Sequence, residues 1–269
     1  MEQYKSKIMA FGMSKKGLQR ENNEDNYQMG VYYKKIFIEQ DSHTFESDYN
    51  DRYQIVSVFD GMGGGEGGEK ASLYAAKEIY LAYMKLRANV SLYKDVEVIV
   101  KNAFQSANNR IIEDSSEILG TTGVVGIFDL KQNLTKFIWS GDSRAYLYRD
   151  NQLFQLTEDQ SLGAERLRQR YYTKQNSQYQ VDRNKLTGYI GSDEYGYIFR
   201  PLDCEWIPLK ECDVFLLATD GFYESFSNEE LKKRIKSCKE NVCADKVKDV
   251  FNVDDSEDDA TCIFTIVNV

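Results

Sequence analysis

The sequence predicts an α+β sandwich, in which strands and helices are grouped rather than strictly alternating. Three strand-like runs follow one another, with no helix between them, from residue 123 to residue 149. Two long stretches with helical spacing of apolar residues stand together earlier, between residues 68 and 112. Grouped elements of this kind favour packed layers over a repeated strand–helix–strand unit. With 269 residues and no linker-like segment, the chain is expected to form a single domain over 1–269.

Strands are expected where short runs rich in β-branched and aromatic residues end at turn residues. Such runs lie at Tyr53–Phe59, Gly123–Asp129, Lys136–Trp139, Arg144–Arg149, Asp213–Ala218 and Thr261–Val267. Most of these runs are too short for a helix, and turn residues lie near their ends.

Helices are expected where apolar residues recur every three or four positions. The two long ones lie at Gly68–Leu86 and Asp95–Ile112, the second opened by Asp95 as its N-cap. Shorter helices are expected at Asn228–Ser237, with Asn228 as the cap, and around Asn241–Phe251.

One long segment lacks clear periodicity. Residues 162–200 are rich in arginine, glutamine and tyrosine. A stretch of that length without regular pattern is typical of a functional flap or an exposed insertion. The flap is expected at about 162–191.

Composition excludes several classes of function. The net charge is −9, from 43 acidic and 34 basic side chains, so no binding to nucleic acid is expected. The sequence has no run of 18 apolar residues and no apolar leader, so neither membrane insertion nor secretion is expected. Five cysteines without a C-x-x-C spacing fit a reducing compartment, and the cytoplasm is the expected location.

A single histidine, His43, stands in the polar stretch DSHTFESDYND. Zinc sites that need several histidines are therefore excluded. A Ser-His-Asp or Cys-His triad would have to use His43, which is expected to lie in a solvated loop. Any chemistry is then expected to depend on carboxylates and hard cations.

Acidic residues recur at the expected ends of apolar strands, mostly beside glycine. They are Asp60 in VSVFDG, Asp142 in IWSGDS, Asp220 in LLATDG, and the pair Asp258-Asp259 before TCIFTIV. A further block, Arg20-x-x-x-Glu24-Asp25, adds a cation and two carboxylates. Taken singly, each is more typical of a turn than of a ligand. Together they indicate one acidic site.

The chemistry of such a site follows from its charge. Carboxylates that converge repel one another unless a cation neutralises them. Oxygen ligands without histidine or thiolate select hard ions, Mg²⁺ or Mn²⁺. Glycine after the acid lets the backbone approach closely, so the Gly61 carbonyl can also coordinate. Two such ions about 3.5–4 Å apart activate a bridging water for in-line attack on a phosphoryl group, which predicts a phosphate-ester hydrolase.

Seven sequence blocks carry a resemblance to a known family. They are GLQRENNED (17–25), VFDGMGGGEGGEKAS (58–72), GTTG (120–123), SGDSRAYLYR with LTEDQS (140–161), NKLTGYIG (184–191), LLATDGFYE (216–224) and DDATCIF (258–264). In this order they resemble the metal-dependent serine/threonine protein phosphatases of type 2C, the PPM family, in its bacterial branch. The resemblance implies a four-layer α-β-β-α fold with two central antiparallel sheets flanked by helix pairs. It also implies hydrolysis of phosphoserine and phosphothreonine in proteins that a serine/threonine kinase has modified.

The resemblance assigns the metal ligands by position. Asp60 would bridge two Mn²⁺ or Mg²⁺ ions, and the Gly61 carbonyl would complete one of the two sites. Asp220 and Asp258 would hold the other ion. Asp142, together with Asp220, matches the residues that hold a third ion in bacterial members, although a hairpin turn alone also explains it.

The remaining roles and the departures from the pattern also follow by position. Glu24 and Asp25 would hold coordinated waters, and Arg20 would bind the substrate phosphate through its planar fork of donors. Met62 stands where many eukaryotic members have a histidine proposed as general acid, as in bacterial relatives. The proton for the leaving group would then come from metal-bound water or another group. Gln160 replaces the histidine of the D-H-S block and is no metal ligand.

Two rival interpretations remain open at this point. The spacing Gly63-x-Gly65-x-x-Gly68 satisfies a dinucleotide-binding pattern, but Asp60 and the acidic residues of the loop would repel a pyrophosphate. A non-catalytic relative that only binds a partner would be indicated by a missing metal ligand, and the expected ligands are all present.

Overall fold

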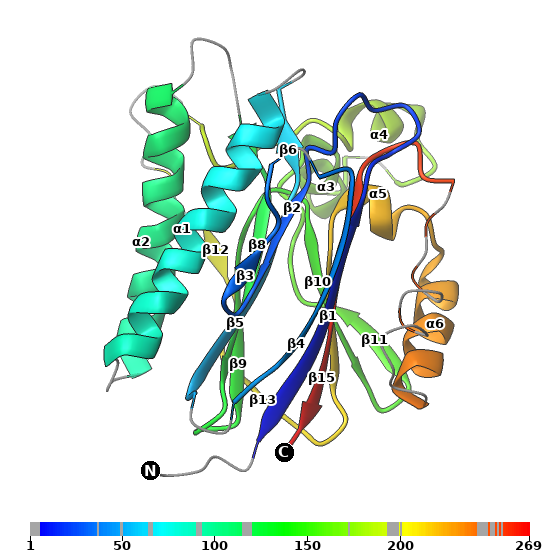
Figure 1. The fold of residues 1–269 in the computed structure, drawn as a ribbon. Coiled ribbons are helices and arrows are strands. Elements are labelled where there is room, and N and C mark those ends of the chain that lie inside the picture. The colour runs from blue at the N-terminus through cyan, green and yellow to red at the C-terminus, as the bar shows by residue number, and fades with distance from the viewer. Residues whose placement is uncertain are drawn as a thin grey trace.

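The computed structural model describes most of the chain, namely residues 6–36, 38–48, 51–63, 67–89, 93–114, 120–171, 173–192, 199, 201–240, 247, 251, 253 and 255–269. Two antiparallel sheets pack face to face, with helices on both outer faces (Figure 1). This arrangement is the four-layer α-β-β-α sandwich that the resemblance implied, so the expected fold class is confirmed.

One sheet has six strands in the described residues, in the order β11-β10-β14-β15-β1-β4. The strands are β1 (Lys7–Lys15), β4 (Gln40–Glu46), β10 (Arg144–Arg149), β11 (Gln152–Gln155), β14 (Val214–Ala218) and β15 (Ala260–Asn268). Strands β1 and β15 pair along their full length, with Phe11 opposite Phe264. The N-terminal and C-terminal strands are therefore neighbours, which brings residues 17–25 beside the start of β15.

The other sheet has seven strands in the described residues, in the order β12-β9-β8-β5-β2-β3, with β13 paired to β9. The strands are β2 (Asn26–Met29), β3 (Tyr32–Tyr33), β5 (Tyr53–Phe59), β8 (Gly123–Asp129), β9 (Leu134–Ser140), β12 (Leu202–Asp203) and β13 (Ile207–Pro208). Every residue of β5 and β8 is buried. Because both faces of this sheet are covered, these strands have continuous apolar runs instead of an alternating pattern.

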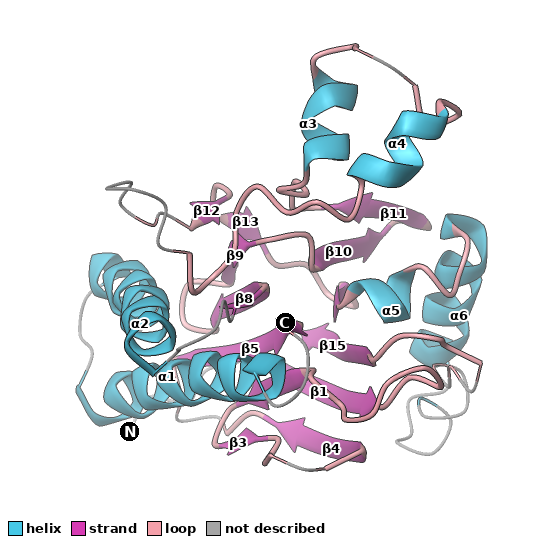
Figure 2. Ribbon diagram, turned by 90° about the horizontal axis from the view of Figure 1, so that it is seen from above, coloured by secondary structure: helices cyan, strands magenta, loops and turns pink. Residues whose placement is uncertain are grey.

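Helices cover the two outer faces of the sandwich and one end (Figure 2). They are α1 (Gly67–Asn89), α2 (Tyr93–Asp114), α3 (Leu162–Arg168), α4 (Ser177–Asp182), α5 (Asp220–Tyr223) and α6 (Asn228–Glu240). A short ribbon of β6 (Gly61–Met62) and β7 (Gly120–Thr121) lies beside α1. Among the described helices, none is long and apolar enough to cross a membrane.

Three buried layers hold the sandwich together. The middle layer lies between the sheets, where Phe128 and Phe137 of one sheet contact Phe215 of the other at ring-centroid distances of 5.4 and 5.5 Å. A second layer lies under α1 and α2, and a third lies under α5 and α6. Burial of this apolar surface is the main stabilising contribution and fixes the strand ends that carry the acidic residues.

Two of the expected helix caps are wrong. Helix α2 begins at Tyr93, so Asp95 lies inside its first turn and is not the N-cap. At α6 the cap is Ser227, whose hydroxyl accepts the Glu230 N–H at 3.3 Å, while the Glu230 carboxylate accepts the Ser227 N–H at 3.0 Å. This reciprocal pair is a capping box, which makes Asn228 the first helical residue. Most of the helix expected around 241–251 lies outside the described residues.

His43 does not lie in a solvated loop. It belongs to the edge strand β4, where it is paired with Gly12 of β1. Its ring stacks on Tyr32 with centroids 4.0 Å apart and planes 11° from parallel. In this strand every second residue is exposed and most of the others are polar too. The stretch therefore lacks the apolar residues by which a strand is predicted from sequence.

Candidate active site

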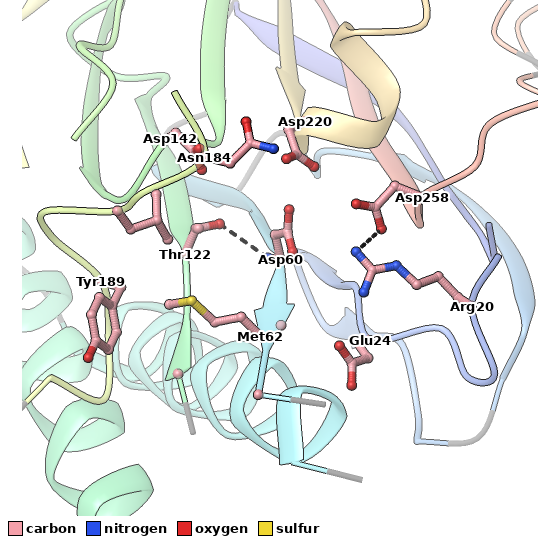
Figure 3. A pocket seen from close by; sticks show the side chains of 14 residues that line it. Arg20, Glu24, Asp60, Met62, Thr122, Asp142, Asn184, Tyr189, Asp220 and Asp258 are labelled. Carbon is pink, nitrogen blue, oxygen red and sulfur yellow. Dashed lines mark hydrogen bonds and ion pairs between the residues drawn. The ribbon is translucent and has the colours of Figure 1, made fainter. Parts of the chain in front are cut away.

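The acidic residues expected from the sequence converge at one end of the sandwich. Asp60 follows β5 of one sheet, whereas Asp220 follows β14 and Asp258 precedes β15 of the other. They line a pocket of about 480 Å³, in which their side chains point toward one another (Figure 3). Arg20, Glu24, Gly61 and Asp142 line the same pocket.

Asp60 is held by the two threonines of the GTTG block. Its backbone carbonyl accepts the Thr122 N–H and the Thr121 hydroxyl, each at 2.8 Å. Its N–H donates to the Thr122 hydroxyl at 3.3 Å, and that hydroxyl contacts the Ser143 hydroxyl at 2.6 Å. The turn after β5 is therefore fixed by β7 and by the β9–β10 hairpin, which orients the Asp60 carboxylate toward the pocket.

Gly61 lies where no side chain fits. A Cβ atom there would be 2.2 Å from the Gly68 carbonyl oxygen and 2.5 Å from the Glu24 carbonyl oxygen. A Cβ on Gly68 would in turn be 2.8 Å from the Glu24 carboxylate. The two glycines therefore allow α1 to start against the β5 turn, and they keep Glu24 beside the Gly61 backbone.

Asp220 and Asp60 are two half-buried carboxylates that face each other from the two sheets. Asp220 opens α5, with Thr219 in the extended conformation of an N-cap. Burial raises the pKa of both carboxyl groups, and the neighbouring charge of Asp220 raises the pKa of Asp60 further. The Oδ1 atom of Asp220 is buried and has no hydrogen-bond partner among the described residues. A buried oxygen of this kind is an available ligand for a cation.

Asp258 is paired with Arg20. The Nη2 atom of Arg20 lies 2.5 Å from Oδ1 of Asp258, and both side chains are partly exposed. The hydrogen bond to Asp258 raises the pKa of the Arg20 guanidinium above its ordinary value. Arg20 therefore places its positive charge beside Asp258, the carboxylate that the resemblance assigns to a metal ion.

Glu24 and Asp25 lie in the segment before β2, and of the two only Glu24 lines the pocket, whereas Asp25 is buried. Burial raises the pKa of Glu24 to about 7. Asp25 is 1% exposed, and its Oδ2 accepts the Thr219 hydroxyl at 2.8 Å. Asp259, next to Asp258, accepts the Glu24 N–H at 2.7 Å. These bonds connect the N-terminal segment to the starts of α5 and β15.

Asp142 lies in the turn between β9 and β10, and it also faces the pocket. Gly141 before it has φ +103°, and a Cβ there would be 2.6 Å from the Thr122 side chain, so the turn requires glycine. Burial and the charge of Asp220 raise the pKa of Asp142 to about 8. The Asp142 carbonyl accepts the Tyr223 hydroxyl at 3.2 Å. Asp142 is therefore both a residue of the β9–β10 turn and a residue of the pocket wall.

The pocket also contains residues that the sequence interpretation did not single out. Thr122, Asn184, Leu186 and Tyr189 line it, the last three from the end of the flap. The sequence signal for these three flap residues is the block NKLTGYIG, and the signal for Thr122 is the block GTTG. Ile190 pairs with Thr121 through two backbone hydrogen bonds of 2.9 Å, which anchors the flap end to the site.

The donor set fits hard cations. All of its side-chain donors are carboxylate oxygens, and Gly61 adds a backbone carbonyl. Within the described residues, no three acidic, histidine or cysteine side chains already stand close enough together to hold a metal ion. Arg20 pairs with Asp258. This contact relieves part of the repulsion between carboxylates that a divalent cation would otherwise neutralise.

Comparison with known proteins gives the family. The family model for protein phosphatase 2C matches residues 24–259. The serine/threonine phosphatase stp of Listeria welshimeri is 30% identical over 227 residues, which cover 82% of this chain and 81% of the relative. The protein phosphatase PhpP of Streptococcus pneumoniae is 26% identical over 205 residues, covering 72% of this chain and 80% of the relative.

Solved structures agree in fold. A serine/threonine phosphatase of S. agalactiae superposes with a TM-score of 0.77 at 20% identity, covering 97% of this chain and 99% of that one. Stp1 of Staphylococcus aureus gives 0.74 at 23% identity, covering 96% and 94%. The phosphatase PstP, solved in complex with two manganese ions, gives 0.69 at 19% identity, covering 98% and 100%. Because the family model spans most of the sequence and the fold agrees, the chain belongs to the protein phosphatase 2C family.

Proposed function

We propose that this chain, as a serine/threonine protein phosphatase of the 2C type, acts through a binuclear Mn²⁺ or Mg²⁺ centre and in-line attack of an activated water. The observation that carries the proposal is the convergence of Asp60, Asp220 and Asp258 with Arg20 in one pocket. When bound, the two ions would supply the activated water and the positive charge that the transferring phosphoryl group requires.

The residues that would hold the ions are those of the pocket wall. Asp60 would contact both ions, the Gly61 carbonyl one of them, and Asp220 and Asp258 the other. The buried Oδ1 of Asp220 and the close packing at Gly61 support this assignment. Asp142 would add a third, weaker site, since a single carboxylate leaves most of the coordination to water.

The substrate phosphate would be bound by Arg20. A guanidinium has five N–H donors in a planar fork, so the ion pair with Asp258 leaves donors for phosphate oxygens. Glu24, which lines the pocket, and Asp25, which is buried, would hold waters bound to the ions. Met62 lines the pocket but cannot transfer a proton, so the proton for the leaving alkoxide would come from water within the site or from another group.

The flap is proposed to select the phosphoprotein. A second pocket of about 600 Å³ adjoins the first and shares Arg20, Asn184 and Asp258 with it. Arg183, at the end of α4, and Glu224 also line this second pocket. We extend the proposal to a single domain over 1–269 and a flap at about 162–191. Substrates modified by a serine/threonine kinase, a cytoplasmic location and no nucleic-acid partner also remain part of it.

The experiment that tests the function is hydrolysis of an aryl phosphate with added Mn²⁺. Activity is expected in the wild-type protein, loss after treatment with a chelator, and recovery when Mn²⁺ returns. Asp60→Asn is expected to remain inactive at any Mn²⁺ concentration while keeping the fold by circular dichroism. Full activity after dialysis against chelator would overturn the metal centre, and inactivity under all conditions would indicate a non-catalytic relative.

A further inference from the structure

A fully buried lysine lies behind the acidic site. Lys34 follows β3 and is 1% exposed, and its side chain is among the largest that the structure buries completely. Its backbone N–H donates to the Tyr27 carbonyl at 3.1 Å, which continues the β2–β3 pairing. Lys35, the next residue, is exposed and places its ammonium group 3.6 Å from the Tyr33 ring centroid. Lysine is rarely buried unless its charge is paired, so the inward position of Lys34 needs an explanation.

The Lys34 ammonium group is bonded to two separate stretches of backbone. Its Nζ donates to the Asn23 carbonyl at 3.3 Å and to the Ile38 carbonyl at 3.2 Å. The Lys34 carbonyl accepts the Asn26 side-chain N–H at 3.2 Å. Residues 23 and 26 flank Glu24, which lines the pocket, and Asp25, which is buried. Lys34 therefore holds the backbone on both sides of them.

Three buried carboxylates act on the same ammonium group through their charge. Asp25, Glu69 and Asp259 are 1%, 3% and 4% exposed and come from three different segments of the chain. Burial lowers the pKa of Lys34, and these carboxylates, with Asp41, oppose that effect. A buried cation among buried anions offsets part of the cost of taking either out of water.

The carboxylates beside Lys34 are in turn bonded to the elements that carry the site. Asp259 accepts the Gly17 N–H at 2.9 Å and the Glu24 N–H at 2.7 Å. Asp25 accepts the hydroxyl of Thr219, the residue before Asp220. A displacement of these carboxylates would therefore move Glu24 and the start of α5 together.

We propose that Lys34 is a positioning residue of the metal centre, because its buried ammonium group fixes the 23–26 backbone and balances the carboxylates behind the pocket. Glu24 is thereby held in the pocket wall, and Asp25 is held buried beside Thr219, before any ion binds. Groups that orient the ligands of a metal typically change its affinity about 10–100-fold when they are removed. The inference rests on the proposed function, since it requires the Mn²⁺ or Mg²⁺ site.

The sign of the effect separates positioning from simple charge repulsion. A lysine close to a divalent cation repels it, so removing the charge alone would tighten the binding of Mn²⁺. Loss of a positioning contact has the opposite effect, because the ligands then have to be ordered when the ion binds. A weaker binding of Mn²⁺ in the Lys34 variant is therefore the specific expectation.

The test is a calorimetric titration of the full chain with Mn²⁺ alone, comparing wild type, Lys34→Met and Lys35→Met. The second variant removes the same charge from an exposed neighbour and is the matched control. Lys34→Met is expected to raise the Kd for Mn²⁺ about 10–100-fold, and Lys35→Met to leave it within roughly twofold. At saturating Mn²⁺, Lys34→Met is expected to keep the wild-type KM for an aryl phosphate, because Lys34 does not line the pocket.

Each other result has a definite meaning. Equal or tighter Mn²⁺ binding in Lys34→Met would overturn the inference, and so would a lower Tm with unchanged Mn²⁺ affinity. If Lys34→Met does not fold, Lys34→Gln takes its place. It removes the charge but keeps an N–H donor for the carbonyls, so a smaller loss of Mn²⁺ affinity in the same direction is expected. Failure of both to fold would make Lys34 a core residue and reject the positioning role. A wild-type protein that does not bind Mn²⁺ would reject the proposed function instead.

Discussion

The pocket wall and the flap are built in opposite ways. Asp60 and Asp220 follow strands whose residues are all buried, so the positions of these carboxylates are fixed by the core of the sandwich. The flap stands at the end of the sandwich (Figure 2), with Tyr171 74% exposed and Val181 57% exposed. From this difference we expect the chemistry to depend on the core, and the choice of substrate, as proposed above, on the exposed insertion.

The flap nevertheless has a small core of its own. Asp182 is fully buried, and its carboxylate accepts bonds from Arg166 at 2.7 Å and from Lys185 at 2.9 Å. Both ends are attached near the pocket, where Leu162 donates to the Lys185 carbonyl at 2.8 Å. The weak sequence periodicity reflects two short helices held by ion pairs, since neither helix packs on the main apolar core.

The largest effect is expected from Asp220→Asn. Loss of a charged ligand at the centre of the wall should reduce kcat by several orders of magnitude, while the fold is retained. The same change removes one of several mutually repelling buried carboxylates, so the Tm of the metal-free protein is expected to rise. Kinetics with an aryl phosphate and a thermal melt in chelator measure the two quantities.

The matched control for this variant is Asp255→Asn. Asp255 is exposed and lines the adjoining pocket but not the acidic one. Its substitution is expected to leave kcat and Tm close to the wild-type values. Comparable losses of kcat in both variants would show that the pocket wall has no special role.

Arg20→Ala is expected to act mainly on substrate binding. A fixed cation meets the phosphate in the ground state and in the transition state, so KM should rise with a smaller loss in kcat. The loss of one charge-assisted contact corresponds to about 1.5–3 kcal/mol. Lys16→Ala, which removes a cation from the same segment outside the pocket, is the control. An unchanged KM would leave Arg20 with only its ion pair to Asp258.

Asp142→Ala should separate a turn residue from a metal ligand. If Asp142 supplies a weak third site, kcat falls and the Mn²⁺ concentration needed for activity rises, while two ions still bind tightly. If the residue serves only the β9–β10 turn, the Tm falls and kcat is unchanged in the folded protein. We expect the first result, because the Asp142 side chain lies in the pocket with a pKa raised to about 8.

The smallest effect on chemistry is expected from shortening the connection between α3 and α4. Rates on phosphopeptides should change more than rates on a small aryl phosphate, because the exposed residues of this connection do not line the acidic pocket. Paired kinetics on the two substrates measure the difference. Equal losses on both would assign the flap a structural role and remove the contrast with the wall.

The strands predicted from sequence are those in the middle of the sheets. Tyr53–Phe59, Gly123–Asp129 and Arg144–Arg149 agree with β5, β8 and β10 residue for residue. Strands β1 and β4 were missed. The apolar run of β1 is short, has one β-branched residue and is followed by Gly12, and β4 is a polar stretch in which exposed residues alternate. Pairing with neighbouring strands supplies their stability, and that information is not local.

The sequence by itself determined the chemical character of this protein. The order of seven blocks identified the family. Acidic residues beside glycine after apolar runs predicted that Asp60 and Asp220 belong to one acidic pocket, because strand ends and turns have strong local signals. Only the tertiary structure decided what stands behind them. Lys34 is one of two adjacent lysines in the stretch YYKKIF, with no local signal of a role, until the fold buries it where the charges of Asp25, Glu69 and Asp259 act on it. Burial and long-range charge depend on which segments meet, and no local pattern of residues records that.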